Sequence, residues 1–385
     1  MPSINGKPDA SVVAALRRGL LRWYREHHRR LPWRSTPAPA PAPGSGGNRT
    51  GKNRADPYHV LVSEAMLQQT QVATVVGYFA RFVAALPTVR ALAEADEQAV
   101  LRLWQGLGYY RRARHLHAAA RAIVTEHGGA VPDTVAGLLQ LPGVGRYTAG
   151  AVASIAFARR AAVLDGNVTR VLTRLFAIDQ PVDRPHVKAM LWKLAERLVP
   201  PTHPGDFNQA LMELGAVICT PRRPACLSCP VSRWCRANQS GQVQRYPVSA
   251  ARRAPRPVGH HVVAIEKGGA FLFEQRPPEG LWSNLWQMPT AEDLAADASG
   301  RTVGRWVARR FGIALRGLRN TGAFTHPTTH RRITFTLWRG SVASGRLKRG
   351  AGVWRRQDRI DDLPLSNPQR RAIAELRGTE ASRVG

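Results

Sequence analysis

The chain has 385 residues, of which 44% are hydrophobic and 21% are charged. This is an ordinary globular composition, which excludes wholesale disorder, and the length suffices for two or three domains. With 56 Lys and Arg residues against 26 Asp and Glu residues, the formal net charge is +30. Such an excess favours a polyanionic partner, and nucleic acid comes before the alternatives of an anionic membrane surface or a compositional bias toward Arg.

No apolar stretch of the sequence approaches the roughly 18 residues that a membrane span requires. The N-terminal stretch also lacks the apolar core and the small-residue cleavage site of a signal peptide. We therefore expect no membrane association and a cytoplasmic, nucleoid-associated protein.

The first part of the chain has the apolar periodicity of helices. Residues 9–30 and 58–236 carry apolar side chains at helical spacing, interrupted by short Pro and Gly turns. Between them, the low-complexity segment 37–55 is predicted to be a disordered insertion, since its Pro, Ala, Gly and basic residues cannot bury a core. The sequence thus predicts a mostly α protein whose helical domain covers 1–237.

The last third of the chain has a different pattern. Residues 238–259 are polar and rich in Pro and Arg, which is typical of a linker. After them come short β-type runs, HVVAIEK, FLFEQR and ITFTLWRG, around a helical stretch near 302–311. We predict a small α+β domain at 260–385.

Four cysteines lie within 17 residues, with the spacing Cys-x6-Cys-x2-Cys-x5-Cys: Cys219, Cys226, Cys229 and Cys235. In a reducing compartment such a group indicates metal or cluster ligation rather than disulfides. The spacing, with no His inside it, favours a [4Fe–4S] cluster. Structural zinc is the main alternative, and unliganded thiols are a minor one. The arginines of the intervening loops would face a phosphate backbone: Arg222, Arg223 and Arg233.

The stretch LQLPGVGRYTAGAVASIAFA at 139–158 predicts a helix, a tight Gly turn and a second helix. Gly143 and Gly145 allow the backbone to turn sharply and to approach a ligand closely. The amides at the start of the second helix can then hold a phosphate oxygen. Many helical hairpins carry such a turn for folding alone, but in a chain of this charge it indicates binding to the DNA backbone without sequence specificity.

Two carboxylates are candidates for catalysis. Asp165, in VLDGNVTRVL, directly precedes a helical run, where the simplest role for it or for Asn167 is a helix N-cap. The same position favours an ionised carboxylate, which could stabilise a cationic sugar. Glu64 falls on an apolar helical stripe, where a Glu is usually an edge residue or is satisfied by a partner. Apolar surroundings can, however, raise the pKa of a carboxyl enough for it to act as a general acid at neutral pH. Cleavage of a glycosidic bond requires such a pair.

Several motifs occur together and in order: SEAMLQQTQVATV, WQGLGYYRRARHLH, LPGVGRYTAGA, LDGNVTRVL, FNQALMELGAVIC and the cysteine spacing. With them, residues 20–36 and 56–237 resemble MutY-type adenine DNA glycosylases, of the helix-hairpin-helix, iron–sulfur superfamily. The resemblance implies a two-lobed glycosylase domain with a [4Fe–4S] loop and a Nudix-like domain behind it. It also implies a monomer that acts on double-stranded DNA containing adenine mispaired with 8-oxoguanine or guanine.

The resemblance assigns roles to individual residues. Glu64 matches the acid that protonates adenine, and Asp165 matches the carboxylate that stabilises the oxocarbenium ion, with Tyr147 and Asn167 as polar supports. The other matches are DNA contacts: Trp33, Arg34 and Gln209 at the flipped base, Gln69 and Tyr109 wedged into the duplex, Thr70 at the opposite lesion, and Gln68 beside them. From the residues alone, Tyr109 would be a core aromatic.

The resemblance also bears on the reaction type. Endonuclease III-type lyases carry a nucleophilic Lys where this chain has Tyr147, so a monofunctional glycosylase is implied. A mismatch glycosylase with another base preference is one alternative, and a non-catalytic iron–sulfur DNA-binding protein is another. The presence of both Glu64 and Asp165 argues against the pure binder.

A Nudix hydrolase holds its metal ions with glutamates on one helix. The corresponding stretch here, GRWVARRFGI, carries Arg305, Arg309 and Arg310 instead. The domain therefore resembles a lesion-recognition module without a catalytic Nudix motif.

The family's lesion-checking loop in this domain has the pattern Phe-Ser-His. It matches either Phe324-Thr325-His326 or, by its spacing to the following strand, Thr328-Thr329-His330. The second register fits the strand better and makes Thr329 and His330 the candidate lesion contacts.

Overall fold

The computed structural model describes residues 9–35, 55–249 and 254–381. The chain divides into two units: Met1–Glu94 with His115–Ala251, and Ala95–Arg114 with Arg252–Gly385. The predicted insertion at 37–55 lies outside the described residues except for Ala55, which is buried.

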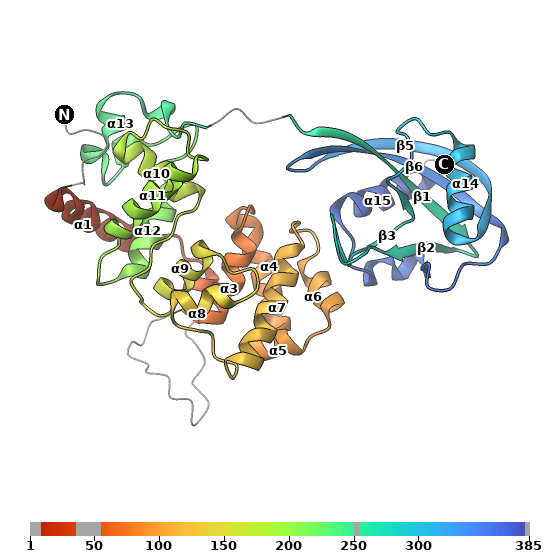
Figure 1. The fold of residues 1–385 in the computed structure, drawn as a ribbon, viewed down its shortest axis with the longest axis horizontal. Coiled ribbons are helices and arrows are strands. Elements are labelled where there is room, and N and C mark those ends of the chain that lie inside the picture. The colour runs from red at the N-terminus through yellow and green to blue at the C-terminus, as the bar shows by residue number, and fades with distance from the viewer. Residues whose placement is uncertain (1–8, 36–54, 250–253, 382–385) are drawn as a thin grey trace. The chain divides into compact units, whose positions relative to one another are not determined.

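The first unit is built of helices (Figure 1). The first turn of α7 belongs to the second unit. The bounds are α1 Ala10–His27, α2 Pro32–Ser35, α3 Pro57–Leu67, α4 Val72–Ala85, α5 Val89–Glu94, α7 Arg111–Glu126, α8 Val135–Gln140, α9 Arg146–Ile155, α10 Gly166–Phe176, α11 Pro185–Leu198, α12 Pro204–Val217 and α13 Arg236–Gln239, with 3-10 helices at Cys226–Ser228, Ser232–Trp234 and Val243–Arg245.

The helices of this unit form two lobes. In one lobe, α1, α10, α11 and α12 bury a common core, to which each contributes a leucine that is almost fully buried: Leu20, Leu172, Leu191 and Leu211. The cysteine loop packs against this core through Val231. In the other lobe, α3 packs against α4 and α9, and α8 packs against α9. The contact between α9 and α12 joins the lobes.

Local sequence explains where the key helices begin. Asp56 accepts a hydrogen bond from the Tyr58 amide, and Pro57 occupies the first turn of α3, where its missing N–H costs nothing. Asp165 likewise caps α10 by accepting from the Val168 amide at 2.7 Å. These caps place Glu64, on α3, and the start of α10 at defined positions.

The second unit is built on one mixed sheet. Its strands lie in the order β3-β2-β1-β6-β5, with β4 beside β1 and β7 beside β2; β1 and β6 are paired in parallel, and the other pairs of these strands are antiparallel. The strands are β1 Arg256–Lys267, β2 Ala270–Gln275, β3 Trp286–Gln287, β4 Thr290–Ala291, β5 Ile313–Pro327, β6 Arg331–Gly345 and β7 Val353–Arg356; the helices are α6 Glu97–Trp104, α14 Gly300–Phe311, α15 Asn367–Ala381 and the 3-10 helix Gln357–Asp362.

Helices cover both faces of this sheet (Figure 1). Because side chains alternate along a strand, Val262 of β1 packs in the core that contains Ile373 of α15. The next residue, Val263, packs in the core that contains Val307 of α14. The strand therefore reads as a continuous apolar run in the sequence.

The predicted fold class, a helical glycosylase domain followed by a small α+β domain, is confirmed. The helical stretch expected near 302–311 is α14. Strands β1 and β6, with 12 and 15 residues, are longer than the runs HVVAIEK and ITFTLWRG that predicted them, and β5, with 15 residues, corresponds to none of the predicted runs. The apolar signal of β5 is weak because it lies at the edge of the sheet and most of its side chains are exposed. Within the described ranges, no helix is long and apolar enough to cross a membrane.

Candidate active site

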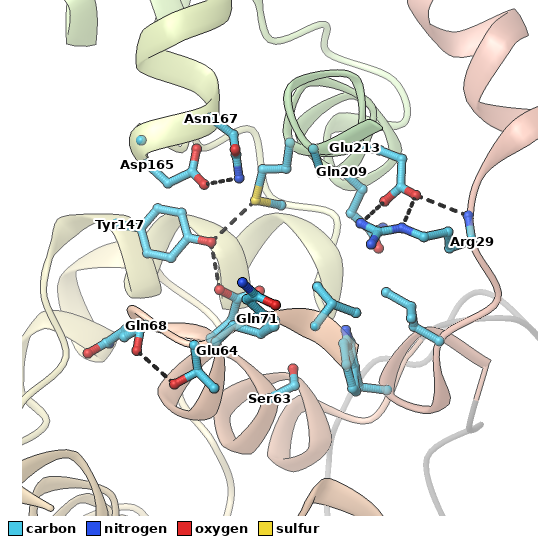
Figure 2. Close-up of a pocket in the computed structure, with 18 of the residues that line it drawn as sticks. Arg29, Ser63, Glu64, Gln68, Gln71, Tyr147, Asp165, Asn167, Gln209 and Glu213 are labelled. Carbon is cyan, nitrogen blue, oxygen red and sulfur yellow. Dashed lines mark hydrogen bonds and ion pairs between the residues drawn. The ribbon is translucent and has the colours of Figure 1, made fainter. Parts of the chain in front are cut away.

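A cavity of about 660 Å³ lies in the first unit and gathers most of the predicted site residues (Figure 2). Its walls come from α2 and α3, from α9, from the start of α10 and from α12. The predicted residues that line it are Trp33, Arg34, Glu64, Gln68, Gln69, Thr70, Tyr147, Asp165, Asn167 and Gln209. The fold thus brings together four sequence motifs that the chain separates.

Glu64 is buried on α3, with 4% of its surface exposed. The pKa of its carboxyl is raised to about 7, chiefly by burial and in addition by the nearby charge of Asp165. The hydrogen bond from the Tyr147 hydroxyl to Glu64 Oε2, at 2.7 Å, and the charge of Arg34 both oppose this rise. A carboxyl with this pKa is about half protonated at neutral pH, so a proton is available for transfer.

Asp165 sits at the start of α10, at the rim of the same cavity. Its Oδ1 accepts from the Val168 amide at 2.7 Å and its Oδ2 accepts from Asn167 Nδ2 at 3.0 Å. Burial raises the pKa of Asp165, and these hydrogen bonds and the charge of Arg170 counteract the rise. The predicted N-cap and the pocket-facing carboxylate are therefore one and the same group.

Tyr147, on α9, lies between the two carboxyls, as Figure 2 shows. Burial, reinforced by the charges of Glu64 and Asp165, raises the pKa of its hydroxyl well above the ordinary value, so the phenol stays neutral and donates. The hydroxyl also lies 3.2 Å from the sulfur of Met212 on α12.

Three charged residues of the cavity were not predicted from the sequence: Arg29, Arg170 and Glu213. Glu213, on α12, has no exposed side-chain surface and accepts from Arg29 Nε at 2.6 Å and from Arg34 at 2.9 Å. Burial alone would raise the pKa of Glu213, but the hydrogen bonds and charges of the two arginines outweigh it and lower the pKa. Its spacing of four residues from Gln209 places both on one face of α12, which is the signal that could have identified it.

A chain of hydrogen bonds runs from the cavity toward the cysteine loop. Arg170 donates to Asn167 Oδ1 at 2.8 Å and to the Gly215 carbonyl at 2.7 Å. It also donates from Nε to the carbonyl of Cys219 at 2.8 Å. Arg170 therefore connects the residue that holds Asp165 to the first cysteine.

The predicted hairpin is formed by α8, the turn at 141–145 and α9. Gly143 has φ +74°, and a Cβ there would lie 2.4 Å from the Cβ of His115, so only glycine fits. Gly145 has an ordinary φ of −90°, open space around its Cβ position and no side-chain cap, so it leaves the amides of α9 accessible. Gly143 is therefore required for the turn, whereas nothing around Gly145 requires a glycine.

The two predicted wedge residues are both on the surface. Gln69, with φ 57°, and Tyr109, with φ 49°, adopt left-handed backbone conformations. Tyr109 is 50% exposed, so the core-aromatic interpretation of this residue is wrong. It belongs to the segment 95–114 of the second unit and does not line the cavity.

The four cysteines line one small cavity together with Arg174. Arg174 is buried; it donates to Cys219 Sγ at 3.3 Å and to the carbonyls of Thr220 and Pro221. Burial raises the pKa of Cys229 to about 11. In the part of the chain that the structure describes, no three Cys, His, Asp or Glu side chains are grouped closely enough to hold a single metal ion.

In the second unit, the sequence Thr328-Thr329-His330 forms the tip of the hairpin between β5 and β6, and Thr329 and His330 are exposed there. Phe324 is buried and stacks on Phe335, with ring centroids 5.2 Å apart, so the aromatic of the alternative register belongs to the core. On the surface of α14, Arg305 and Arg309 are exposed.

Comparison with known proteins agrees with this geometry. Residues 62–197 match the model of the HhH-GPD superfamily base excision DNA repair protein, and residues 260–375 match the NUDIX domain. Among solved structures, a thermostable thymine-DNA glycosylase is 28% identical, with a TM-score of 0.50, over 60% of this chain and 100% of that one.

Relatives also match over most of this chain. The adenine DNA glycosylase of Homo sapiens is 38% identical over 86% of this chain and 67% of its own length. That of Schizosaccharomyces pombe is 35% identical over 84% of this chain and 80% of its own length. With both domains matched in order and a helical cavity that holds two carboxyls, the chain belongs to the MutY-type adenine DNA glycosylases of base excision repair.

Proposed function

We propose that this glycosylase removes adenine paired with 8-oxoguanine or guanine, by hydrolysis of the N-glycosidic bond and without lyase activity. The observation that carries the proposal is the cavity in which Glu64, Tyr147 and Asp165 converge. Tyr147 occupies the position at which a lyase needs an amine, and its raised pKa keeps it a neutral donor.

The first step falls to Glu64. A stacked adenine cannot reach a buried carboxyl, so the base must be flipped into the cavity, where Trp33, Arg34 and Gln209 line the walls. With a pKa of about 7, Glu64 carries a proton that it can deliver to a ring nitrogen of the base. Protonation makes adenine a better leaving group.

The second step falls to Asp165. As the C–N bond breaks, positive charge develops on the sugar, and an ionised carboxylate beside it lowers the energy of the oxocarbenium ion. The Val168 amide and Asn167 donate to both oxygens of Asp165, which stabilises its charged form. Two carboxyls in different surroundings thus take opposite protonation states.

The cofactor proposed is a [4Fe–4S] cluster, which members of this family typically carry. Four thiols around one cavity fit it, and Cys219, Cys226, Cys229 and Cys235 would hold it. When bound, the cluster would fasten the loop against α10. Iron and sulfide near four each per chain are expected, and zinc instead would overturn the assignment.

Base release from duplexes in a single turnover tests the function. Adenine opposite 8-oxoguanine and adenine opposite guanine should be released, while thymine opposite guanine should not. Glu64→Gln should slow release by about 10²-fold or more, since Gln cannot deliver a proton. Glu94→Gln, an exposed carboxylate on α5, is the matched control and should release adenine at the wild-type rate.

The alternative is a mismatch glycosylase with a different base preference, because the similar thermostable glycosylase is described as acting on thymine. Preferential release of thymine in the same assay would favour it. DNA binding without release of any base would favour the non-catalytic alternative.

A further inference from the structure

The surface of the second unit around α14 has a charge pattern that the base-release chemistry does not use. From Ala298 to Gln357 the chain contains no Asp or Glu. The helix α14 buries Val303 and Val307 and turns three arginines to solvent, one turn apart: Arg301, Arg305 and Arg309. Among the described residues, none of these three has a carboxylate partner within ion-pair distance.

The loop after β6 extends this surface. The backbone amide of Lys348 donates to the carbonyl of Phe311, and its ammonium donates to the carbonyl of Arg309 at 2.7 Å. Arg346, Lys348 and Arg349 are all exposed beside the end of α14. We call the six residues the α14 basic face: Arg301, Arg305, Arg309, Arg346, Lys348 and Arg349.

We propose that the α14 basic face binds the phosphate backbone of duplex DNA away from the mismatch. Arginines four residues apart on a helix are about 6 Å apart along its axis. A DNA strand carries one charge per ~3.4 Å of helix axis, so each step along α14 spans about two phosphates. A surface that served only solubility would carry charges of both signs, whereas the six residues of this face are all positive. DNA, the substrate of the enzyme, is a polyanion of the opposite charge.

The position of the face within the fold argues for flanking DNA. The C-terminal part of this face lies at the end of the β5–β6 hairpin where Gly312 approaches Arg346, and the tip at 328–330 is the other end. The 15 residues of β5, at ~3.3 Å each, span at most about 50 Å between the two ends, the length of about 15 base pairs. Phosphates held here are therefore different from those at the tip.

The test measures the affinity of the full chain for a 40-base-pair duplex without a mismatch. Binding is monitored by fluorescence anisotropy at salt concentrations between 50 and 200 mM. The variant Arg301→Gln/Arg305→Gln/Arg309→Gln retains helix propensity, since Gln and Arg rank together. Losing three phosphate contacts should flatten the slope of log K against log salt by about 2.7. Over this salt range wild type should then lose about 40-fold more affinity than the variant.

The matched control replaces three exposed arginines elsewhere on the same unit: Arg356→Gln/Arg359→Gln/Arg370→Gln. It should retain the wild-type slope. An unchanged slope in the α14 variant, with its thermal unfolding intact, overturns the proposal. An equal change in the control overturns it too, because the effect would then be net charge alone. Since the duplex carries no mismatch, the result is independent of base release and of the proposed function.

Discussion

Replacing Glu64 with Gln should stabilise the protein at alkaline pH, because this buried carboxyl destabilises the fold once it is ionised. Its pKa is about 7 in the folded state, against an ordinary value of 4.5. Between these pH values the folded state holds a proton that the unfolded state has released. The free energy of unfolding therefore falls as the pH rises from about 4.5 to 7 and is constant above that window.

The size of the effect follows from the pKa difference. At 1.36 kcal/mol per unit, a rise from 4.5 to about 7 corresponds to about 3 kcal/mol of lost stability at pH 8. At pH 5 most of this loss has not yet occurred. Gln keeps the shape of Glu and an oxygen that can accept from the Tyr147 hydroxyl, which lies 2.7 Å from Glu64 Oε2. The substitution thus removes the charge and leaves the packing.

Urea unfolding followed by tryptophan fluorescence measures the difference between Glu64→Gln and wild type at pH 5 and pH 8. The advantage of the variant should grow by about 2 kcal/mol between the two pH values. Glu94→Gln, whose carboxylate is exposed, should show no such growth. A difference that is the same at both pH values would mean that Glu64 is ionised throughout, and both its raised pKa and its role as an acid would be refuted.

Four further substitutions test the site and the hairpin. Asp165→Asn should retain the thermal stability of wild type, since Asn caps helices as well as Asp, yet slow single-turnover base release by about 10²-fold or more. Glu213→Gln should lower the free energy of unfolding by about 2–3 kcal/mol, because it removes the countercharge of Arg34, which is 12% exposed, and of the half-buried Arg29. Gly143→Ala should weaken DNA binding by about tenfold, while Gly145→Ala should bind normally, because only the first meets a side chain and a positive φ.

Each of these has a clear contrary result. Wild-type base release in the Asp165 variant would leave that residue as a helix cap only. An unchanged unfolding free energy in the Glu213 variant would mean that solvent already screens its arginines. Equal DNA binding by the two glycine variants would mean that the turn at Gly143 does not contribute to DNA binding.

Much of this protein was predictable because its signals are local. Helical periodicity, the N-cap residues Asp56 and Asp165 and the Gly143 turn depend on neighbours within a few positions, so the helices and their starts could be predicted. The ordered set of motifs carried the family resemblance. The weak strand β5 was not predicted, because its edge position leaves it little apolar pattern.

The chemistry of the cavity was decided by tertiary structure. The hydrogen bond from Tyr147 to Glu64 joins residues 83 positions apart, and no local pattern encodes it. The pKa of Glu64 depends on how completely α3 is buried, and the buried ion pairs of Glu213 depend on where α12 meets the N-terminal segment. The sequence supplied the carboxyl groups, whereas their protonation states depend on desolvation and on neighbouring charges, which only packing creates.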